Sequence, residues 1–380
     1  IAPGRFVLEL FHGPTLAFKD VAMQLLGRMM DHVLAERDRR ATIVGATSGD
    51  TGGAAIEAFR GRDRTDVFIL FPDGRVSDVQ RRQMTTPTDA NVHSLALEGT
   101  FDDCQAIVKG MFTHPAFRDR VQLAGVNSIN WARIVAQVVY YFVAGVALGA
   151  PHRPVSFTVP TGNFGDIFAA HVAARMGLPI EKLVIATNAN DILVRTLETG
   201  AYTMNGVVPT SSPSMDIQVS SNFERLLFEA HGRDSDAVRG LMARLAQSGG
   251  FTLEDGAMKR IRDEFAAGRC DEAATARTIA DTLARSGYLL DPHTATGVHV
   301  AGQLSQSPTP MVVLATAHPA KFPDAVEAAS GVRPELPEEL QPMMSAPERM
   351  ERLPAGREEV EAHVLDHARA ARETSPAEVS

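Results

Sequence analysis

The feature that most constrains the fold of this chain is a repeated order of short apolar run, turn and helical pattern. Apolar runs rich in β-branched residues lie at 41–45, 66–71, 92–97 and 155–159, and each is followed by a turn and then by a stretch with helical patterning. Strands that alternate with helices in this way build parallel sheets with helices on their faces. The sequence therefore predicts an α/β fold.

The remaining elements follow from the same patterns. Further strands are predicted at 183–186 and 311–315, and helices dominate 220–286. Thr100 and Asp103 are placed to form a capping box at the start of a helix that runs to about Phe112. A helix over 130–148 is rich in Val, Tyr and Phe and is expected to be buried. Other helices are predicted at 53–59, 77–84 and 164–176, and a charged surface helix is predicted at 356–373.

Composition narrows the class of protein. A chain of 380 residues suits about two domains, and 44% hydrophobic with 22% charged residues is an ordinary globular balance. The sequence contains no run of about 18 apolar residues, so it predicts no membrane span. The net charge of -9 argues against nucleic acid as a partner. Cys104 and Cys270 fit no metal-binding spacing and no disulfide framework, which favours a reducing cytoplasm.

A lysine follows an apolar stretch near the start of the chain. Lys19 comes directly after Leu16-Ala17-Phe18 and a Gly13-Pro14 turn. Among apolar groups an amine loses stabilisation of its charge, so its pKa falls and it can attack aldehydes. The alternative is a turn followed by a helix with a solvated Lys.

Two glycine-rich segments lie between a predicted strand and a predicted helix, at 46–53 and 160–166. Free N–H groups and the positive end of a helix favour an anion there, although many such turns bind nothing. Asp166 is unfavourable beside a dianion unless it faces away or caps the helix.

A third segment, 127–133, could bring Ser128, Asn130 and Arg133 together, and an Arg fork suits phosphate. The alternative is a helix cap with a surface Arg.

Eight segments occur in an order that resembles the threonine synthases of bacteria and fungi. They read HGPTLAFKD, ATSGDTGGAA, FPDGRVSDVQRRQMTT, LEGTFDDCQAIVKGMF, NSINWARI, PTGNFGDIFA, DPHTATG and ATAHPAKF, and the likeness extends over nearly all of residues 5–330. Members of this branch carry several dozen residues before the first segment, and this sequence begins without them.

The resemblance implies pyridoxal 5'-phosphate (PLP) fold type II, the fold of the tryptophan synthase β subunit, with two α/β domains and the cofactor in the cleft between them. It implies a large PLP-binding domain of 1–35 and 128–330, a small α/β domain of 36–127, and a C-terminal connector and helix at 331–380. Residues 332–355 are expected to be a loose connector.

The resemblance also implies roles for individual residues. Lys19 would hold the cofactor covalently and act as the base. Asp50 stands where related enzymes often carry an Asn near the ring, and Thr316 matches a hydroxyl near the ring nitrogen. The loop around the cofactor phosphate would consist of Gly162, Asn163, Phe164, Gly165 and Asp166. The substrate would be received by Ser48, Thr51, Ser128, Asn130 and Arg133.

The implied reaction converts O-phospho-L-homoserine and water into L-threonine and phosphate, in a cytoplasmic monomer or homodimer without a metal. Two alternatives stay open. One is another PLP lyase of this fold, such as a serine or threonine dehydratase, which needs no second phosphate site. The other is a non-catalytic relative that binds PLP or phosphorylated ligands.

Overall fold

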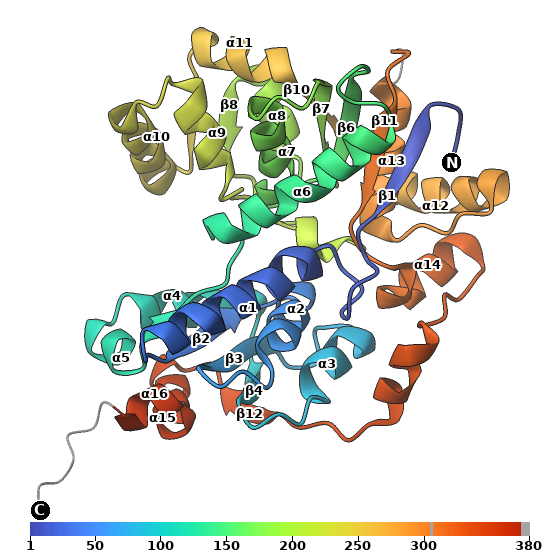
Figure 1. Ribbon diagram of the computed structural model, residues 1–380. Coiled ribbons are helices and arrows are strands. Elements are labelled where there is room, and N and C mark those ends of the chain that lie inside the picture. The colour runs from blue at the N-terminus through green and yellow to red at the C-terminus, as the bar shows by residue number, and fades with distance from the viewer. Residues whose placement is uncertain (305–306, 374–380) are drawn as a thin grey trace, which may run out of the picture. The chain divides into compact units, whose positions relative to one another are not determined.

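The computed structural model describes residues 1–304 and 307–373, which form two compact units (Figure 1). The first unit contains residues 1–12 and 131–335, and the second contains residues 13–130 and the described residues from Leu336 onward. Each unit is built around one parallel sheet, so the predicted α/β class is confirmed.

The elements of the first unit are β1 (Arg5–Glu9), α6 (Trp131–Ala147), β6 (Val155–Pro160), α7 (Gly165–Arg175), β7 (Ile180–Thr187), α8 (Ile192–Thr199), β8 (Ala201–Thr203), η1 (Pro213–Met215), α9 (Phe223–Ala230), α10 (Ser235–Ser248), β9 (Gly250–Thr252), α11 (Asp255–Glu264), β10 (Phe265–Arg269), α12 (Glu272–Ser286), α13 (Pro292–Leu304), β11 (Met311–Ala315), η2 (Pro319–Lys321) and α14 (Pro323–Ser330). Those of the second unit are α1 (Lys19–Glu36), β2 (Ala41–Ala46), α2 (Asp50–Phe59), β3 (Thr65–Pro72), α3 (Asp78–Thr85), β4 (Val92–Glu98), α4 (Phe101–Phe112), α5 (Pro115–Arg120), β5 (Leu123–Ala124), η3 (Glu338–Ser345), β12 (Glu351–Pro354), α15 (Arg357–His367) and α16 (Arg369–Glu373).

The first sheet has the strand order β1-β11-β6-β7-β10, and its strands are parallel. The register pairs Glu9 with Ala315 and Pro160 with Ala186, so the carboxyl ends of these four strands meet at one edge. In open α/β sheets this edge is where ligands bind.

Helices cover both faces of the first sheet. Phe157 of β6 packs its ring edge-on against Tyr141 of α6, at a centroid distance of 4.9 Å. Neighbouring residues along a strand point to opposite faces. Accordingly Val184 of β7, whose partner Thr158 follows Phe157, joins a core cluster with residues of α12 and α13 on the other face.

The second sheet has the order β12-β4-β3-β2-β5 and is also parallel. Phe68 and Leu70 of β3 form a core cluster with residues of α4, α5, α15 and α16 on one face. The opposite face packs against α2, where a Cβ on Gly52 would come within 2.8 Å of Ile69 Cγ2. Helix α1 lies closely on α2, because a Cβ on Gly27 would meet the Ala58 carbonyl oxygen at 2.3 Å.

Most predicted elements are present, and the capping box of Thr100 and Asp103 is confirmed. The expectation that the helix at 130–148 is buried is wrong for one face of α6. Along that face Val139, Val143 and Val146 are 60–63% exposed, whereas Arg133 and Tyr141 on the inner face are buried. Strands β1, β5, β8, β9, β10 and β12 were not predicted.

The compact units differ from the expected domain boundaries chiefly in residues 13–35 and in the C-terminal segment. Residues 13–35 group with the second unit, since α1 packs on α2. Residues 332–355 are more than a connector, because β12 pairs with β4. The helix expected at 356–373 is two helices, and Val360 and Val364 of α15 are fully buried in the core of the second unit. Residues 374–380 of the predicted C-terminal segment lie outside the described residues.

Candidate active site

Lys19 is the first residue of α1, and its side chain is only 10% exposed. Its Nζ lies 3.3 Å from Oδ2 of Asp50 and 5.2 Å from the centre of the Phe18 ring. The second carboxylate oxygen of Asp50 accepts a hydrogen bond of 3.0 Å from Gln80 Nε2. The surroundings of Lys19, expected to be apolar, therefore include the carboxylate of Asp50, which the Gln80 amide holds in place.

The turn before α1 fixes the position of Lys19. The backbone N–H and the hydroxyl of Thr15 donate to the Asp20 carboxylate at 2.8 and 2.6 Å. Gln83 Nε2 donates to the carbonyl of Thr15 at 3.1 Å. Gly13 permits this close turn, since a Cβ there would lie 2.5 Å from Asp20 Oδ2. The residue next to Lys19 is thus anchored to the loop in front of the helix.

The turn between β2 and α2 places Asp50 at the start of α2. Thr47 Oγ1 accepts the N–H groups of Gly49 and Gly52, each at 2.9 Å. Gly49 has φ 140°, and a Cβ there would come within 2.3 Å of Gln80 Cδ. Ser48 and Thr51, the predicted substrate contacts of this turn, flank Asp50 and Gly49 and are partly exposed.

The predicted phosphate loop follows β6 in the first unit. Its carbonyl groups face the segment 220–222: Gly162 O accepts from Ser220 Oγ at 2.7 Å, and Asn163 O accepts from Asn222 N at 3.0 Å. In the described part of the chain the backbone N–H groups of Gly162, Asn163 and Phe164 donate no hydrogen bond. With Phe164 left-handed at φ 64° and α7 beginning at Gly165, this is a donor set suited to an anion.

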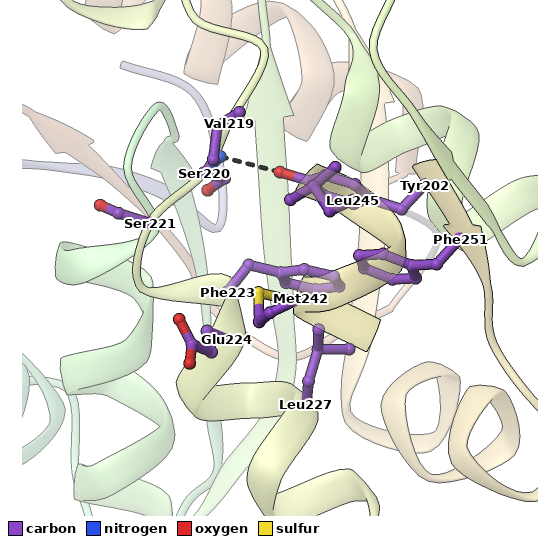
Figure 2. Close-up of a pocket in the computed structure, with 10 residues that line it drawn as sticks. All are labelled: Tyr202, Val219, Ser220, Ser221, Phe223, Glu224, Leu227, Met242, Leu245 and Phe251. Carbon is purple, nitrogen blue, oxygen red and sulfur yellow. Dashed lines mark hydrogen bonds between the residues drawn. The ribbon is translucent and has the colours of Figure 1, made fainter. Parts of the chain in front are cut away.

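Figure 2 shows the aromatic side chains that lie close to Ser220 and Ser221 of this segment. Tyr202 and Phe251 stack at 4.9 Å with nearly parallel rings, and the Tyr202 hydroxyl accepts the Ser220 N–H at 2.8 Å. The ring of Phe223 also lies nearly parallel to that of Tyr202, at a centroid distance of 5.6 Å. Rigid aromatic rings therefore hold the segment to which the loop carbonyls are bonded.

Asp166, predicted as part of the phosphate loop, directs its carboxylate to α6. Its Oδ1 accepts hydrogen bonds from the hydroxyls of Tyr140 and Tyr141, the latter at 2.7 Å. Burial and the charge of Asp166 raise the pKa of both tyrosines well above the usual value, so both hydroxyls stay protonated and donate. This is the outward-facing geometry that a neighbouring dianion requires.

Arg133 lies in the first turn of α6 and is 4% exposed. Burial lowers its pKa to about 10, opposed by Tyr140, so the guanidinium is still charged at neutral pH. Ser128 and Asn130 precede α6 and are partly buried. Thr316 directly follows β11, is 5% exposed, and lies at the sheet edge that carries the phosphate loop.

His318 and Lys321 follow Thr316. The His318 ring packs edge-on against Phe11 at 5.2 Å, and its Nδ1 accepts the Ala320 N–H at 3.1 Å. It lines a cavity of about 570 Å³ together with His12 and Tyr288. Lys321 is fully buried.

Sequence reasoning missed three parts of this arrangement: Gln80, the pair Tyr140 and Tyr141, and segment 220–222. A local signal existed only for Gln80, because Ser77 and Gln80 form a capping box of the S-x-x-Q type at the start of α3. The other two contact the loop from positions distant in sequence.

Within residues 1–304 and 307–373 no group of His, Cys, Asp or Glu could hold a metal ion, and no helix could span a membrane.

Comparison with known proteins identifies the family. A family model described as pyridoxal-phosphate dependent enzyme matches residues 5–259, and one described as threonine synthase, C-terminal, matches residues 294–364. The chain is 54% identical to threonine synthase from Pseudomonas aeruginosa over 365 residues, which cover 96% of this chain and 78% of that protein. The chain belongs to the threonine synthase family.

Solved structures agree with this family. The PLP-bound threonine synthase from Brucella melitensis superposes with a TM-score of 0.95 at 67% identity, covering 97% of this chain and 79% of that one. Threonine synthase from yeast superposes with a TM-score of 0.89 at 40% identity, covering 97% and 78%. The resemblance seen in the eight sequence segments and the fold type that it implied are confirmed.

Proposed function

We propose that this chain is a PLP-dependent threonine synthase, which converts O-phospho-L-homoserine and water into L-threonine and phosphate. The observation that carries the proposal is the buried Lys19 amine, fixed 3.3 Å from Asp50 in a chain of the threonine synthase family. The anion-binding donor set at Gly162–Gly165 suits the cofactor phosphate, and the Asp166 carboxylate next to it accepts hydrogen bonds from Tyr140 and Tyr141.

When bound at Lys19, PLP supplies an electron sink for negative charge on the substrate carbons next to the amino group. The residues of the chain supply binding and proton transfer. In the proposal the Lys19 amine takes and returns protons at successive substrate carbons, which one long side chain can reach in turn. Asp50 and Gln80 hold that amine in place, as the 3.3 and 3.0 Å contacts support.

The remaining residues act by binding. Thr316 would face the ring nitrogen as a neutral hydroxyl. We propose that the substrate phosphate is received by Arg133, whose buried guanidinium keeps its charge. The other substrate contacts proposed are Ser48, Thr51, Ser128 and Asn130. A fixed positive charge in a buried site stabilises the charge that develops on a leaving phosphate.

We also propose that the chain is cytoplasmic and acts as a monomer or a homodimer. Cys104 and Cys270 are both free and buried, which suits a reducing compartment.

The test is a paired assay of threonine and phosphate release from O-phospho-L-homoserine with added PLP. The parent chain should release both products in equal amounts. Lys19→Ala should reduce turnover by at least about 10²–10⁴-fold, because it removes a proton-transfer group. Lys109→Ala, which changes an exposed lysine on α4 of the same unit, is the matched control and should leave turnover unchanged.

Two outcomes would contradict the proposal. Appreciable turnover by Lys19→Ala would remove Lys19 from the chemistry. Formation of a 2-oxo acid from L-serine or L-threonine, without phosphate release from the phosphorylated substrate, would instead assign a dehydratase.

A further inference from the structure

The phosphate loop has an electrostatic problem built into its sequence. Asp166, the second residue of α7, follows directly after the donor set of Gly162–Gly165. A carboxylate that turned toward the loop would repel a dianionic phosphate. The chain therefore needs a device that keeps this side chain away from the loop.

Two adjacent tyrosines of α6 provide it. Both hydroxyls donate to the same oxygen of Asp166, and the Tyr141 hydroxyl also lies 3.1 Å from the Asp166 backbone oxygen. The two bonds therefore restrain the carboxylate and, through Tyr141, the first turn of α7. Asp166, Tyr140 and Tyr141 are 7%, 6% and 0% exposed, so bulk water does not compete for these hydrogen bonds.

The tyrosines are themselves held in place. Their rings contact each other at a centroid distance of 4.9 Å, and Tyr141 also packs edge-on against Phe157 of β6, the strand that leads into the loop. Arg133 lies two turns earlier on α6, and its positive charge acts on Tyr140. The same helix therefore carries the restraint on the carboxylate and the predicted phosphate-binding arginine.

We propose that Tyr140 and Tyr141 are positioning residues that hold the Asp166 carboxylate against α6 and thereby keep the Gly162–Gly165 loop fit for the cofactor phosphate. The inference deepens the proposed function and rests on it, since the phosphate is that of PLP. Asp166 would serve α7 by its negative charge at the helix N-terminus, while the tyrosines prevent that charge from acting on the ligand.

The test compares four versions of this chain by their PLP dissociation constants, measured by titration of absorbance and intrinsic fluorescence. They are the parent, Asp166→Asn, the double variant Tyr140→Phe/Tyr141→Phe, and the triple variant that combines all three changes. The double variant should bind PLP about tenfold more weakly or worse, the scale of a lost hydrogen bond to a charged group. Asp166→Asn alone should stay within about threefold of the parent, since it removes the repelling charge.

The triple variant is decisive. If the tyrosines act by restraining the charge of Asp166, the neutral amide should bring the dissociation constant back to within about threefold of the parent. If they only support packing, the triple variant should bind PLP as weakly as the double variant, and the proposal is overturned. Equal constants for all four proteins would overturn it as well.

Controls separate this inference from the proposed function. A parent chain that binds no PLP would contradict the proposed function itself, whereas a parent that binds PLP with unaltered variants contradicts only the role of the tyrosines. Tyr288→Phe removes another tyrosine–carboxylate bond of the first unit, to Glu9 at 2.6 Å, and should leave PLP affinity unchanged. If the double variant does not fold, the single variant Tyr140→Phe takes its place. It should weaken PLP binding about threefold, and adding Asp166→Asn to it should restore the dissociation constant of Asp166→Asn alone.

Discussion

At the scale of single residues, the site depends on glycines that allow side chains to approach the backbone. Gly49 is the clearest case, because its φ of 140° is unfavourable for any side chain and its Cα faces the amide of Gln80. That amide makes two hydrogen bonds: its Nε2 donates to Asp50 at 3.0 Å, and its Oε1 accepts the Ser77 N–H at 3.3 Å. A side chain at Gly49 would therefore disturb the partner of Lys19 and the capping box of α3 together.

We predict that Gly49→Ala lowers the free energy of unfolding by about 2 kcal/mol or more, from backbone strain and the displaced Gln80. The matched control is Gly74→Ala, in the same unit, at φ 68° with no atom within 4 Å of the added Cβ. It should cost only about 1 kcal/mol. Thermal unfolding followed by circular dichroism measures both, and equal midpoints for the two variants would contradict the role of Gln80.

At the scale of elements, the C-terminal segment is part of the second unit's core. β12 pairs with β4 along Glu351–Pro354, and Arg369 of α16 donates to Asp66 of β3 at 2.7 Å. Val360 of α15 is fully buried in the cluster that contains Phe68 and Leu70. This packing explains why a segment with a polar, proline-rich composition is ordered.

We predict that Val360→Ala destabilises the protein by about 2 kcal/mol, because it leaves a cavity in a closed core. Val33→Ala is the matched control: Val33 also lies in a helix of the second unit but is 38% exposed. Its effect should stay within about 0.5 kcal/mol. Denaturant unfolding measures the difference, and similar costs for the two valines would show that α15 contributes little to the core.

At the scale of the whole molecule, distant parts of the chain are joined through a group of histidine rings. The ring of His93 in β4 stacks on Phe68 at a centroid distance of 4.3 Å. The His367 ring lies 5.5 Å from the His93 ring, and it stacks on His363 at 4.2 Å, again between ring centroids. Burial, followed by the charges of His367, His363, Arg349 and Arg369, lowers the pKa of His93 to about 4. Burial and His367 also lower the pKa of His363. Asp366 and Glu351 act on His363 in the opposite direction.

A histidine whose pKa is lowered in the folded state is neutral in both states above about pH 6.5, the ordinary value. Between about 6.5 and 4 the unfolded chain binds a proton that the folded chain refuses, so stability falls as the pH falls. We predict that the unfolding midpoint of the parent drops over this range more steeply than that of His93→Phe. Acid titration of carboxylates affects both proteins alike. Parallel curves from pH 7 to 4.5 would mean that His93 does not carry the dependence.

The sequence by itself determined the elements whose signal is local. The apolar runs that became β2, β3, β4, β6 and β11 each contain their own pattern, and the cap of α4 needs only Thr100 and Asp103. The glycine-rich turns and Lys19 could be found for the same reason, and their order along the chain carried the family resemblance that the comparisons confirm.

Only the tertiary structure decided which side chains meet. The edge strand β1 is five residues long and finds its partner β11 some 300 residues later, so no local pattern marks it. Asp166 could be read as part of a loop, but its partners Tyr140 and Tyr141 belong to a helix that also has an exposed apolar face. The sequence predicts Lys19 as an amine among apolar groups, whereas folding places Asp50 beside it, with Gln80 bonded to the Asp50 carboxylate. Hydrogen bonds and ion pairs of this kind depend on distance in space, and local periodicity carries no information about it.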